Sequence, residues 1–347
     1  MQSFYKNKRV LITGSTGFVG SWLCLALNRL NAEVYGIGLK PNTNPNIFNI
    51  LELDKKIKQK IININNYSEI KLEIESISPD IVFHLAAQPI VKEGYRNPLE
   101  TFNTNIMGSL NILDICSNLN KSVNLISITT DKCYENEELG NRFLESDSMG
   151  GKDPYSASKA CTEITSKSFA LSFSESRDIK ICTARAGNII GGGDWSNDRI
   201  VTDIIESIRN KQNVLLRSPS SVRPWQHVID VIDGYLKLGV YNSTSSLAFD
   251  SFNFGPKEEN EIDVKSLTSK LLSSWGKSNT NIEIDNSDHP LESEILRLNS
   301  SKAKEILLWE PSMNIDEAIL NTAIWYKKFY DNENMYDFSM QQLSEYI

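Results

Sequence analysis

Short apolar runs alternate with amphipathic segments through the first half of the chain. Short runs rich in valine and isoleucine are typical of buried strands, whereas apolar residues at helical spacing are typical of amphipathic helices. The runs predict strands at residues 9–13, 33–39, 61–64, 80–85, 123–128 and 180–185. Helices are predicted after the turn at 14–20 as far as residue 30, at 67–77, at 98–116 and from residue 154. Strands that alternate with helices form a parallel, doubly wound sheet, so we expect an α/β fold.

The pattern changes after residue 185. Residues 186–195, A-G-N-I-I-G-G-G-D-W, predict either a flexible loop or, from three successive glycines, backbone that lies close against a ligand. Apolar spacing then predicts a helix at 200–210, a strand at 214–217 and helices at 264–274, 300–307 and 316–330. We therefore expect a sheet domain of residues 1–185, which residues 228–255 rejoin. Residues 186–227 and 256–347 would form a smaller mixed α/β lobe.

The first predicted strand runs into the glycine-rich turn G-S-T-G-F-V-G at 14–20. Gly14 allows a tight turn, Gly17 lets a pyrophosphate approach the backbone, and Gly20 lets helix and strand pack closely. Ala86 and Ala87 leave room for a cofactor after the strand at 80–85, although packing alone would also explain them. The Rossmann-type turn therefore predicts a dinucleotide site at Gly14, Thr16, Gly17, Phe18, Val19 and Gly20.

A cluster of polar residues follows the predicted strand at 123–128. Thr130, Asp131 and Lys132 come at its carboxyl end, which is the edge where open α/β sheets bind ligands. Tyr155 and Lys159 lie four residues apart and hence on one face of the next helix. A hydroxyl, a carboxylate, a phenol and two amines can therefore converge on one pocket, and this inventory suits proton transfer coupled to redox chemistry.

The Tyr-x-x-x-Lys spacing is weak evidence by itself. Tyr67 and Lys71 repeat it on a helix that reads as solvent-exposed, and a surface helix is the ordinary explanation of such a pair. Position in the chain distinguishes the second pair, because it follows both a nucleotide-binding turn and a polar strand end. Asp153 can cap its helix and Pro154 suits the first turn.

Composition narrows the class of protein. The chain has 347 residues, of which 40% are hydrophobic and 23% charged, and its net charge is −8. An acidic chain without a basic stretch is unlike a nucleic-acid-binding protein, and no apolar run approaches the roughly 18 residues of a membrane span. The three histidines are not spaced as metal ligands, so no metal site is expected. The five cysteines show no C-x-x-C spacing, and we expect reduced thiols in a cytoplasmic protein (Cys24, Cys116, Cys133, Cys161 and Cys182).

Several motifs together resemble the extended short-chain dehydrogenase/reductase family, and within it the CDP-glucose 4,6-dehydratases. The resemblance covers nearly the whole length of the chain. It rests on T-G-F-V-G-S-W-L at 16–23, H-L-A-A-Q-P at 84–89, P-L-E-T-F-N-T-N-I-M-G at 98–108, D-K-C-Y-E-N at 131–136, G-G-K-D-P-Y-S-A-S-K at 150–159, the glycine-rich segment at 186–195, R-P-W-Q-H-V at 223–228 and F-N-F-G-P at 252–256. Related dTDP- and GDP-sugar dehydratases usually carry Asp-Glu where this chain has Asp131-Lys132, and 4-epimerases lack that pair.

The resemblance implies a role for each polar residue. Tyr155 as phenolate would take the proton of the sugar 4-hydroxyl, which Thr130 also contacts, while hydride leaves C4. A free phenol has a pKa of about 10, and the charges of Lys159 and of the cofactor would lower it. Lys132 would remove the C5 proton, and Asp131 would help the 6-hydroxyl leave as water. The product implied is a CDP-4-keto-6-deoxy sugar.

The resemblance also implies the binding residues. Arg217 and Arg223 are candidate diphosphate ligands, because a guanidinium suits bidentate phosphate binding. The implied substrate contacts are Gln88, Asn188, Arg199, Arg217, Arg223 and Asn253. Beyond the glycine turn, the implied cofactor contacts are Lys40, Asn63, Leu85, Ala86, Ala87, Asn105, Tyr155 and Lys159.

The chain departs from the family at four places. Val19 replaces a lysine of the glycine turn, Lys40 replaces the acid that usually ends the second strand, and Asn63 replaces an aspartate on the adenine side. Near the C-terminus His-Pro-His-Glu becomes His-Pro-Leu-Glu at 289–292. We expect NAD as the cofactor, with NADP admissible because an acid at position 40 would repel the 2′-phosphate and Lys40 does not.

Alternatives to this activity remain on the same fold. Another nucleotide-sugar 4,6-dehydratase or a 4-epimerase is the enzymatic alternative, and a dinucleotide-sensing scaffold without turnover is the non-enzymatic one. Such a scaffold would be free to lose Tyr155 or Lys159, and both are present. The expected partners are a small nucleotide-sugar substrate and a second copy of the chain in a homodimer.

Overall fold

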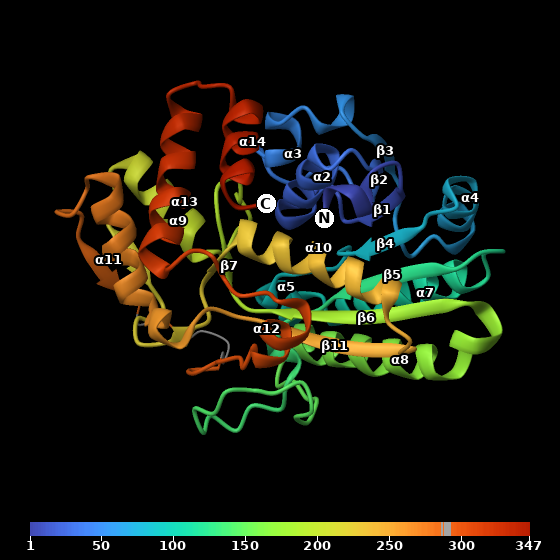
Figure 1. Cartoon of the computed structure of the whole chain (residues 1–347). Coiled ribbons are helices and arrows are strands. Elements are labelled where there is room, and N and C mark those ends of the chain that lie inside the picture. Colours follow the sequence, from blue (N-terminus) through green and yellow to red (C-terminus); the bar gives the residue numbers. More distant parts are fainter. Residues whose placement is uncertain (286, 288–292) are drawn as a thin grey trace.

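A seven-stranded parallel sheet forms the centre of the computed structural model, which describes residues 1–285, 287 and 293–347 (Figure 1). Its strand order is β11-β6-β5-β4-β1-β2-β3, and every neighbouring pair is parallel. The strands are β1 (Arg9–Thr13), β2 (Glu33–Gly38), β3 (Lys58–Ile61), β4 (Ile81–His84), β5 (Val123–Ile128), β6 (Ile179–Ala186) and β11 (Phe249–Phe254). The doubly wound α/β fold predicted from the sequence is confirmed.

Two hydrophobic cores cover the two faces of this sheet. Side chains alternate along a strand, so Val10 and Ile12 of β1 join one core and Leu11 joins the other. The first core is packed by α2 (Phe18–Arg29) and α10 (Val228–Thr244). The second is packed by α4 (Tyr67–Ile77), α7 (Gly108–Ser117) and α8 (Pro154–Arg177).

The third strand is displaced from its predicted position. We expected it at 61–64, but β3 spans Lys58–Ile61. The side-chain oxygen of Asn63 accepts a hydrogen bond from the backbone N–H of Asn65 at 2.9 Å, and such a turn ends a strand. Ile62 and Ile64 are nevertheless buried, because they pack into the second core from the connection to α4 rather than from a strand.

The helix predicted at 98–116 contains a widened turn. Pro98–Phe102 (α6) and α7 are joined without a break by the π-helical turn Asn103–Met107. The carbonyl of Asn105 accepts hydrogen bonds from Ser109 Oγ at 2.6 Å and from Thr162 Oγ1 of α8 at 2.9 Å. The turn therefore joins this helix to α8, which carries the Tyr155–Lys159 pair.

Part of the chain after β6 forms a smaller lobe, and its helices lie at the left of Figure 1. Its helices are α9 (Ile200–Asn210), α11 (Val264–Trp275) and α13 (Ile315–Tyr330), and its short strands are β8 (Val214–Leu216) with β13 (Ile282–Ile284) and β9 (Val222–Arg223) with β12 (Ile262–Asp263). β7 (Ile189–Ile190) pairs with β10 (Gln226–His227), and α12 spans Ser301–Leu307. The C-terminal helix α14 (Met335–Tyr346) packs against α2, α10 and α13.

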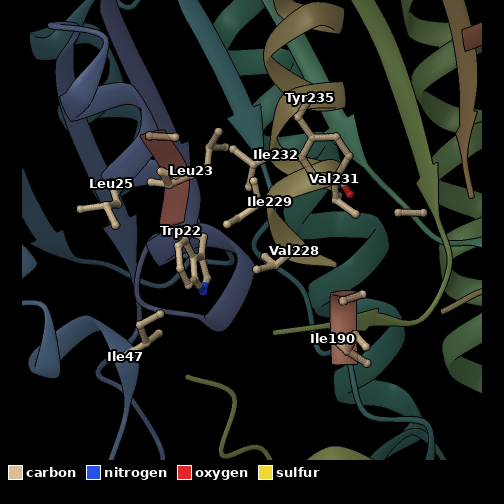
Figure 2. Close-up of a cluster of buried hydrophobic side chains, with 14 of the residues drawn as sticks. Trp22, Leu23, Leu25, Ile47, Ile190, Val228, Ile229, Val231, Ile232 and Tyr235 are labelled. Carbon is tan, nitrogen blue, oxygen red and sulfur yellow. The ribbon is translucent and has the colours of Figure 1, made fainter. Parts of the chain in front are cut away.

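The three successive glycines lie close to protein side chains. A Cβ atom on Gly192 would lie 2.0 Å from Cγ of Trp325, and a Cβ on Gly193 would lie 2.6 Å from Cδ1 of Ile47. The carbonyl of Gly192 accepts a hydrogen bond from Trp22 Nε1 at 3.0 Å. Figure 2 shows Trp22 and Ile47 in this part of the core. The prediction of close backbone approach is confirmed, but the expected ligand is wrong because aromatic and aliphatic side chains occupy that space.

Candidate active site

The turn at 14–20 has the narrow geometry that the glycines predict. Gly14 has φ +76°, and a Cβ on it would lie 2.8 Å from the backbone nitrogen of Ala86. A Cβ on Gly20 would lie 2.1 Å from the carbonyl oxygen of Gly14. Gly17 caps α2 without a side chain, so nothing of its own covers the first N–H groups of the helix. A diphosphate therefore fits the start of α2, where these groups and the helix dipole favour an anion.

The end of the second strand lies beside this turn. Thr16 Oγ1 donates a hydrogen bond to the carbonyl oxygen of Leu39 at 2.8 Å, and a Cβ on Gly38 would lie 2.9 Å from Thr16 Oγ1. Lys40 follows directly and is exposed. The structure therefore places Lys40 next to the expected cofactor site, whereas the exposed Asn63 uses its side-chain oxygen in the turn after β3.

A buried hydrogen-bond chain supports the backbone after β4, and the sequence analysis missed it. Thr13 Oγ1 accepts a hydrogen bond from the N–H of Ala86 at 3.2 Å and lies 2.7 Å from His84 Nδ1. His84 Nε2 in turn lies 2.9 Å from Ser109 Oγ. Burial lowers the pKa of His84 to about 3, so the imidazole is neutral and serves as a link. The chain positions residues 85–87 against the glycine turn.

Gln88 and Asn105 act together on the loop that follows. The Gln88 side chain donates to Thr101 Oγ1 at 2.9 Å and to the carbonyl of Ile90 at 3.0 Å, and its own oxygen accepts from the N–H of Ile90. Asn105 accepts from the backbone N–H of Gln88 at 2.8 Å and donates to Ser158 Oγ at 2.8 Å. The Gln88 amide is thus engaged by its own loop and by Thr101 of α6, and Asn105 ties the loop to α8.

The Tyr155–Lys159 pair faces the end of β5. Asp153 caps α8 by accepting a hydrogen bond from the N–H of Ser156 at 3.0 Å, which orients the first turn. Tyr155 is buried, and its hydroxyl is hydrogen-bonded to Thr130. Lys159 Nζ donates to the carbonyl oxygen of Ile128 at 2.9 Å. The structure therefore brings together a phenol, a hydroxyl and an amine that are up to 29 positions apart in the chain.

Burial dominates the electrostatics of this pair. It raises the pKa of Tyr155 to about 12, while the charge of Arg199 and the hydrogen bond with Thr130 act in the opposite direction. It lowers the pKa of Lys159 to about 8, against the raising effect of Glu163. The sequence analysis expected Lys159 to lower the pKa of the phenol, but in this structure its ammonium group is bound to Ile128 and Arg199 provides the larger lowering effect.

Asp131 is a buried carboxylic acid at the same strand end. Its exposed fraction is 1%, one oxygen accepts from Thr130 Oγ1 at 2.9 Å, and the other has no hydrogen-bond partner in the structure. Burial raises its pKa, although the charges of Lys132 and Arg223 act to lower it. Burial thus favours the protonated form of this carboxyl group, which is the form that can donate a proton. Lys132 is half-buried beside it, in the short helical turn Asp131–Cys133.

A second buried network lies around Glu163, one helical turn after Lys159. Glu163 accepts hydrogen bonds from Thr183 Oγ1 at 2.7 Å and Arg185 Nη2 at 2.8 Å, and Thr129 Oγ1 also donates to it. Arg185 continues to the hydroxyl of Tyr134 at 2.8 Å. This network was not predicted from the sequence; the only local signal was a glutamate four residues after Lys159, hence on the same face of α8.

Two of the expected substrate residues, Arg223 and Asn253, are buried and already hydrogen-bonded within the protein. Arg223 is buried, and its Nη1 donates to the carbonyls of Val222 and Glu294 at 3.0 and 3.1 Å, while its charge acts on Asp131. Asn253 is fully buried and its amide is occupied: its oxygen accepts from Tyr134 at 2.6 Å, and its nitrogen donates to the carbonyl of Phe143 at 2.8 Å. Asn253 therefore holds the segment after Asp131 in place, and this geometry gives no support to a substrate contact.

Comparison with known proteins places this geometry in a family. The sequence profile described as "GDP-mannose 4,6 dehydratase" matches residues 11–322. CDP-glucose 4,6-dehydratase of Salmonella typhimurium is 37% identical over 352 residues, covering 100% of this chain and 98% of that protein. The chain belongs to the GDP-mannose 4,6-dehydratase family. UDP-glucose 4-epimerase of Mycoplasma genitalium is a more distant relative, 24% identical over 93% of this chain and 98% of its own length.

Solved structures share the fold. UDP-glucose 4-epimerase of Thermotoga maritima has a TM-score of 0.79 at 22% identity, with 92% of this chain and 99% of that chain covered. dTDP-glucose 4,6-dehydratase of Bacillus anthracis has a TM-score of 0.77 at 19% identity, with 93% and 98% covered. These structures show the fold alone, whereas the sequence profile and the 37% identical relative confirm the resemblance to a sugar-nucleotide dehydratase inferred from the motifs. One of the four departures from the family pattern, at residues 289–292, lies outside the residues that the structure describes.

Proposed function

We propose that this chain is a CDP-glucose 4,6-dehydratase, which converts CDP-glucose to CDP-4-keto-6-deoxyglucose and water. The observation that carries the proposal is the pair Asp131–Lys132 at the end of β5, beside the hydrogen-bonded Thr130 and Tyr155. An acid and an amine next to the oxidation site supply what elimination of water requires in addition to oxidation. The similarity to the Salmonella typhimurium enzyme supports CDP-glucose as the substrate.

NAD is the cofactor of this proposal. The narrow glycine turn and the uncovered N-terminus of α2 fit its diphosphate, and the backbone at 85–87 borders the same turn. Bound NAD would accept hydride from C4 of the sugar and supply hydride to C6, so no cofactor is consumed. Thr16, Phe18, Val19, Lys40 and Asn63 remain proposed contacts around it, together with Asn105 acting through the loop at 88.

The polar residues share the proton transfers. Tyr155 takes the proton of the 4-hydroxyl, with Thr130 holding that oxygen, and C4 becomes a ketone. The ketone acidifies the neighbouring C5–H, whose proton passes to Lys132. Asp131 gives its proton to the 6-hydroxyl, which leaves as water. Hydride then adds to C6 and a proton returns to C5, so the balance is one substrate to one product and one water. Lys159 orients the site through the carbonyl of Ile128.

Substrate binding is assigned to residues of the smaller lobe that border this site. Arg199 caps α9 and acts on Tyr155, so it lies near the reacting sugar. Arg217 and Arg223 provide cations for the diphosphate. Asn188 directly precedes β7, and its carbonyl accepts a hydrogen bond from the N–H of Gln226 at 3.1 Å, three residues after Arg223. Gln88 and Asn253 are left out, because their amides are engaged within the protein.

The test is turnover of a panel of nucleotide sugars, monitored by mass spectrometry. CDP-glucose should lose one water without net change in nicotinamide absorbance. Deuterium placed at C4 should reappear at C6 of the product. A 4-epimerase would return product of unchanged mass, and a non-catalytic scaffold would return the starting sugar, so either outcome would refute the proposal.

We also propose that the protein works as a homodimer. Four large apolar side chains are exposed on adjoining helices: Leu99 (84%), Met107 (51%), Ile164 (56%) and Leu171 (63%). Leu99 and Met107 belong to α6 and the π-helical turn, and both of these contact α8, which carries the other two. A second copy covering this face would remove them from water. Sedimentation of the wild type and of Leu99→Glu/Leu171→Glu tests the proposal, which predicts a dimer and a monomer respectively.

A cytoplasmic location is proposed on two observations. All five cysteines are free, as expected for a reducing compartment. Across residues 1–285, 287 and 293–347, no helix is long and apolar enough to cross a membrane. Fractionation of the native host with an antibody against the chain would test the location.

A further inference from the structure

The carboxylate of Asp198 lies between two cations from different parts of the fold. Its Oδ1 is 2.6 Å from Lys92 Nζ and 3.5 Å from Arg217 Nη1. Lys92 belongs to α5 (Val91–Arg96), which follows the loop after β4, and Arg217 follows β8 of the smaller lobe. A single oxygen shared by an ammonium and a guanidinium is the arrangement that a phosphate oxygen takes between such groups.

This ion cluster borders the reacting groups. Asp198 immediately precedes Arg199, whose charge acts on Tyr155 and whose Nη2 donates to the carbonyl of Pro89 at 3.4 Å. Asp198, Lys92 and Arg217 have side-chain exposed fractions of 24%, 23% and 25%, so solvent and a polar ligand reach all three. The cluster therefore lies in the substrate region and is accessible, unlike the buried Glu163–Arg185 pair.

The backbone holds Asp198 in an unusual conformation. Its φ is +62°, in the left-handed region that non-glycine residues seldom adopt. The residue lies just before α9 and its N-cap Arg199, and its carboxylate pairs with Lys92 of α5 instead of capping its own helix. Strained backbone is common at functional sites, so the conformation of Asp198 suggests a function for its charge.

We propose that Asp198 is an internal counter-anion, whose carboxylate occupies between Lys92 and Arg217 the place of an oxygen of the substrate's diphosphate. The inference rests on the proposed function, which it deepens in two ways. It makes Lys92 a substrate-binding residue, and it makes Asp198 a competitor that must move aside before the diphosphate binds. Asp198 would then offset the repulsion between the two cations and hold both in place while the site is free.

A simpler explanation is that Lys92 and Asp198 only clasp the two parts of the fold. The two explanations predict opposite signs for one substitution. If Asp198 competes with the diphosphate, its neutral variant binds an anion more tightly, because both cations become available and a repelling charge is gone. If it is only a clasp, loss of either partner loosens the site, so the neutral variant of Asp198 and that of Lys92 both bind more weakly.

The experiment measures dissociation constants for CDP and for inorganic pyrophosphate by calorimetry at low salt. Asp198→Asn and Asp198→Gly both suit a positive φ and both lack the charge. Each should tighten CDP about threefold to tenfold, an effect that shrinks at high salt. Lys92→Met should weaken CDP by about tenfold. Asp316→Asn is the matched control, because it removes one negative charge from another ion pair, the 2.6 Å pair of Asp316 with Lys270. This variant should leave CDP binding unchanged.

The outcomes separate this inference from the proposed function. Weaker or unchanged CDP binding in both Asp198 variants would overturn the inference, even if CDP-glucose is still dehydrated. A wild-type protein that binds neither CDP nor pyrophosphate would overturn the diphosphate site itself. Tighter pyrophosphate binding in Asp198→Asn, in a protein that dehydrates a different nucleotide sugar, would support the inference and overturn only the choice of base.

Discussion

Glu163 and Arg185 form an ion pair of 2.8 Å, with side chains only 2% and 4% exposed, one helical turn from Lys159. The pair is also linked by hydrogen bonds to Thr129 at the end of β5 and Thr183 on β6. Because Glu163 raises the pKa of Lys159 against the effect of burial, the pair influences the charge of the lysine as well as the rigidity of the site.

Glu163→Gln should therefore affect both stability and pH dependence. It leaves the Arg185 charge buried without its counter-charge, which costs about 3–5 kcal/mol. Without Glu163 the pKa of Lys159 falls below its value of about 8, so the ammonium form is lost at lower pH. The basic limb of the pH profile of kcat/KM should move toward acid. Thr183→Val is the matched control: it removes a hydrogen bond to Glu163 but no charge, so it should lower stability without moving that limb.

Tyr155→Phe should reduce turnover by about a thousandfold or more, while NAD affinity changes little. In the proposed mechanism the phenol accepts the proton of the 4-hydroxyl, and the substitution removes only its oxygen. Burial raises its pKa to about 12 in the free protein, so ionisation depends on the nearby positive charges, of which Arg199 is one. The measurements are kcat for CDP-glucose and a fluorescence titration with NAD. Turnover within tenfold of the wild type would exclude Tyr155 as the acceptor.

Lys132→Met should separate oxidation from elimination. In the proposed mechanism, oxidation at C4 needs Tyr155 and Thr130, which the substitution leaves in place, whereas removal of the C5 proton needs the Lys132 amine. Nicotinamide absorbance at 340 nm should therefore rise slowly and persist after CDP-glucose is added. Lys132→Arg keeps the positive charge beside Asp131 but is a poor base, so it should show the same accumulation. Normal turnover in both variants would mean that another group is the base.

Several elements follow directly from local sequence. The predicted strand at 123–128 and the predicted helices at 67–77 and 200–210 agree with β5, α4 and α9 to the residue. Asn66 caps α4 and Asp153 caps α8, so the helix starts carry their own signals. The carboxyl ends of parallel strands also lie at the same edge of a sheet, so the sequence predicted that Thr130 lies at the same edge as the glycine turn.

Other features depend on partners that are distant in the chain. Gly192 indicated a close approach, but the approaching atom belongs to Trp325, and local sequence carries no sign of it. Asn253 matched a family motif, yet its amide is occupied by Tyr134 and Phe143. The Glu163–Arg185 pair was missed for the same reason, because a charged residue on a helix reads as exposed until its buried partner on β6 is seen.

Asp203→Asn should stabilise the protein at neutral pH but not at acid pH. Burial raises the pKa of Asp203 to about 6, and Asp198 and Glu206 act in the same direction, opposed by Arg217 and Lys92. The ordinary pKa is 3.8. As the pH rises from 3.8 to about 6, ionisation of Asp203 therefore lowers the stability of the folded state progressively, and the full loss of stability is reached above pH 6. Removing the charge should add roughly 1–2 kcal/mol at pH 7.5, after allowance for partial exposure, and nothing at pH 3.5.

Denaturant unfolding of the wild type and Asp203→Asn at these two pH values provides the measurement. The difference in unfolding free energy should grow with pH between about 4 and 6 and then level off. Asp316→Asn serves again as the control, since Asp316 is exposed and pairs with Lys270. If the stability difference were equal at both pH values, packing and not ionisation would account for the difference between aspartate and asparagine at position 203.

Lys40→Asp should change the preference between NAD and NADP. Lys40 is exposed directly after Leu39, whose carbonyl accepts the hydrogen bond from Thr16 of the glycine turn, so the side chain starts beside the expected adenosine ribose. An acid at this place accepts a hydrogen bond from the ribose 2′-hydroxyl and repels a 2′-phosphate, whereas a lysine tolerates that phosphate. In a reaction that regenerates its cofactor, redox poise selects only weakly between the two, so discrimination rests on such contacts.

The ratio of NAD to NADP affinity, measured in cofactor-free protein, tests the role of Lys40. The wild type should discriminate weakly, and Lys40→Asp should shift the ratio toward NAD by tenfold or more, which corresponds to about 1.4 kcal/mol. Lys60→Asp provides the control, because Lys60 is another exposed lysine, on the edge strand β3, and its loss changes the net charge by the same amount. Equal ratios in the wild type and Lys40→Asp would mean that Lys40 points away from the ribose, since Pro41 redirects the chain at once, and that another residue sets the choice of cofactor.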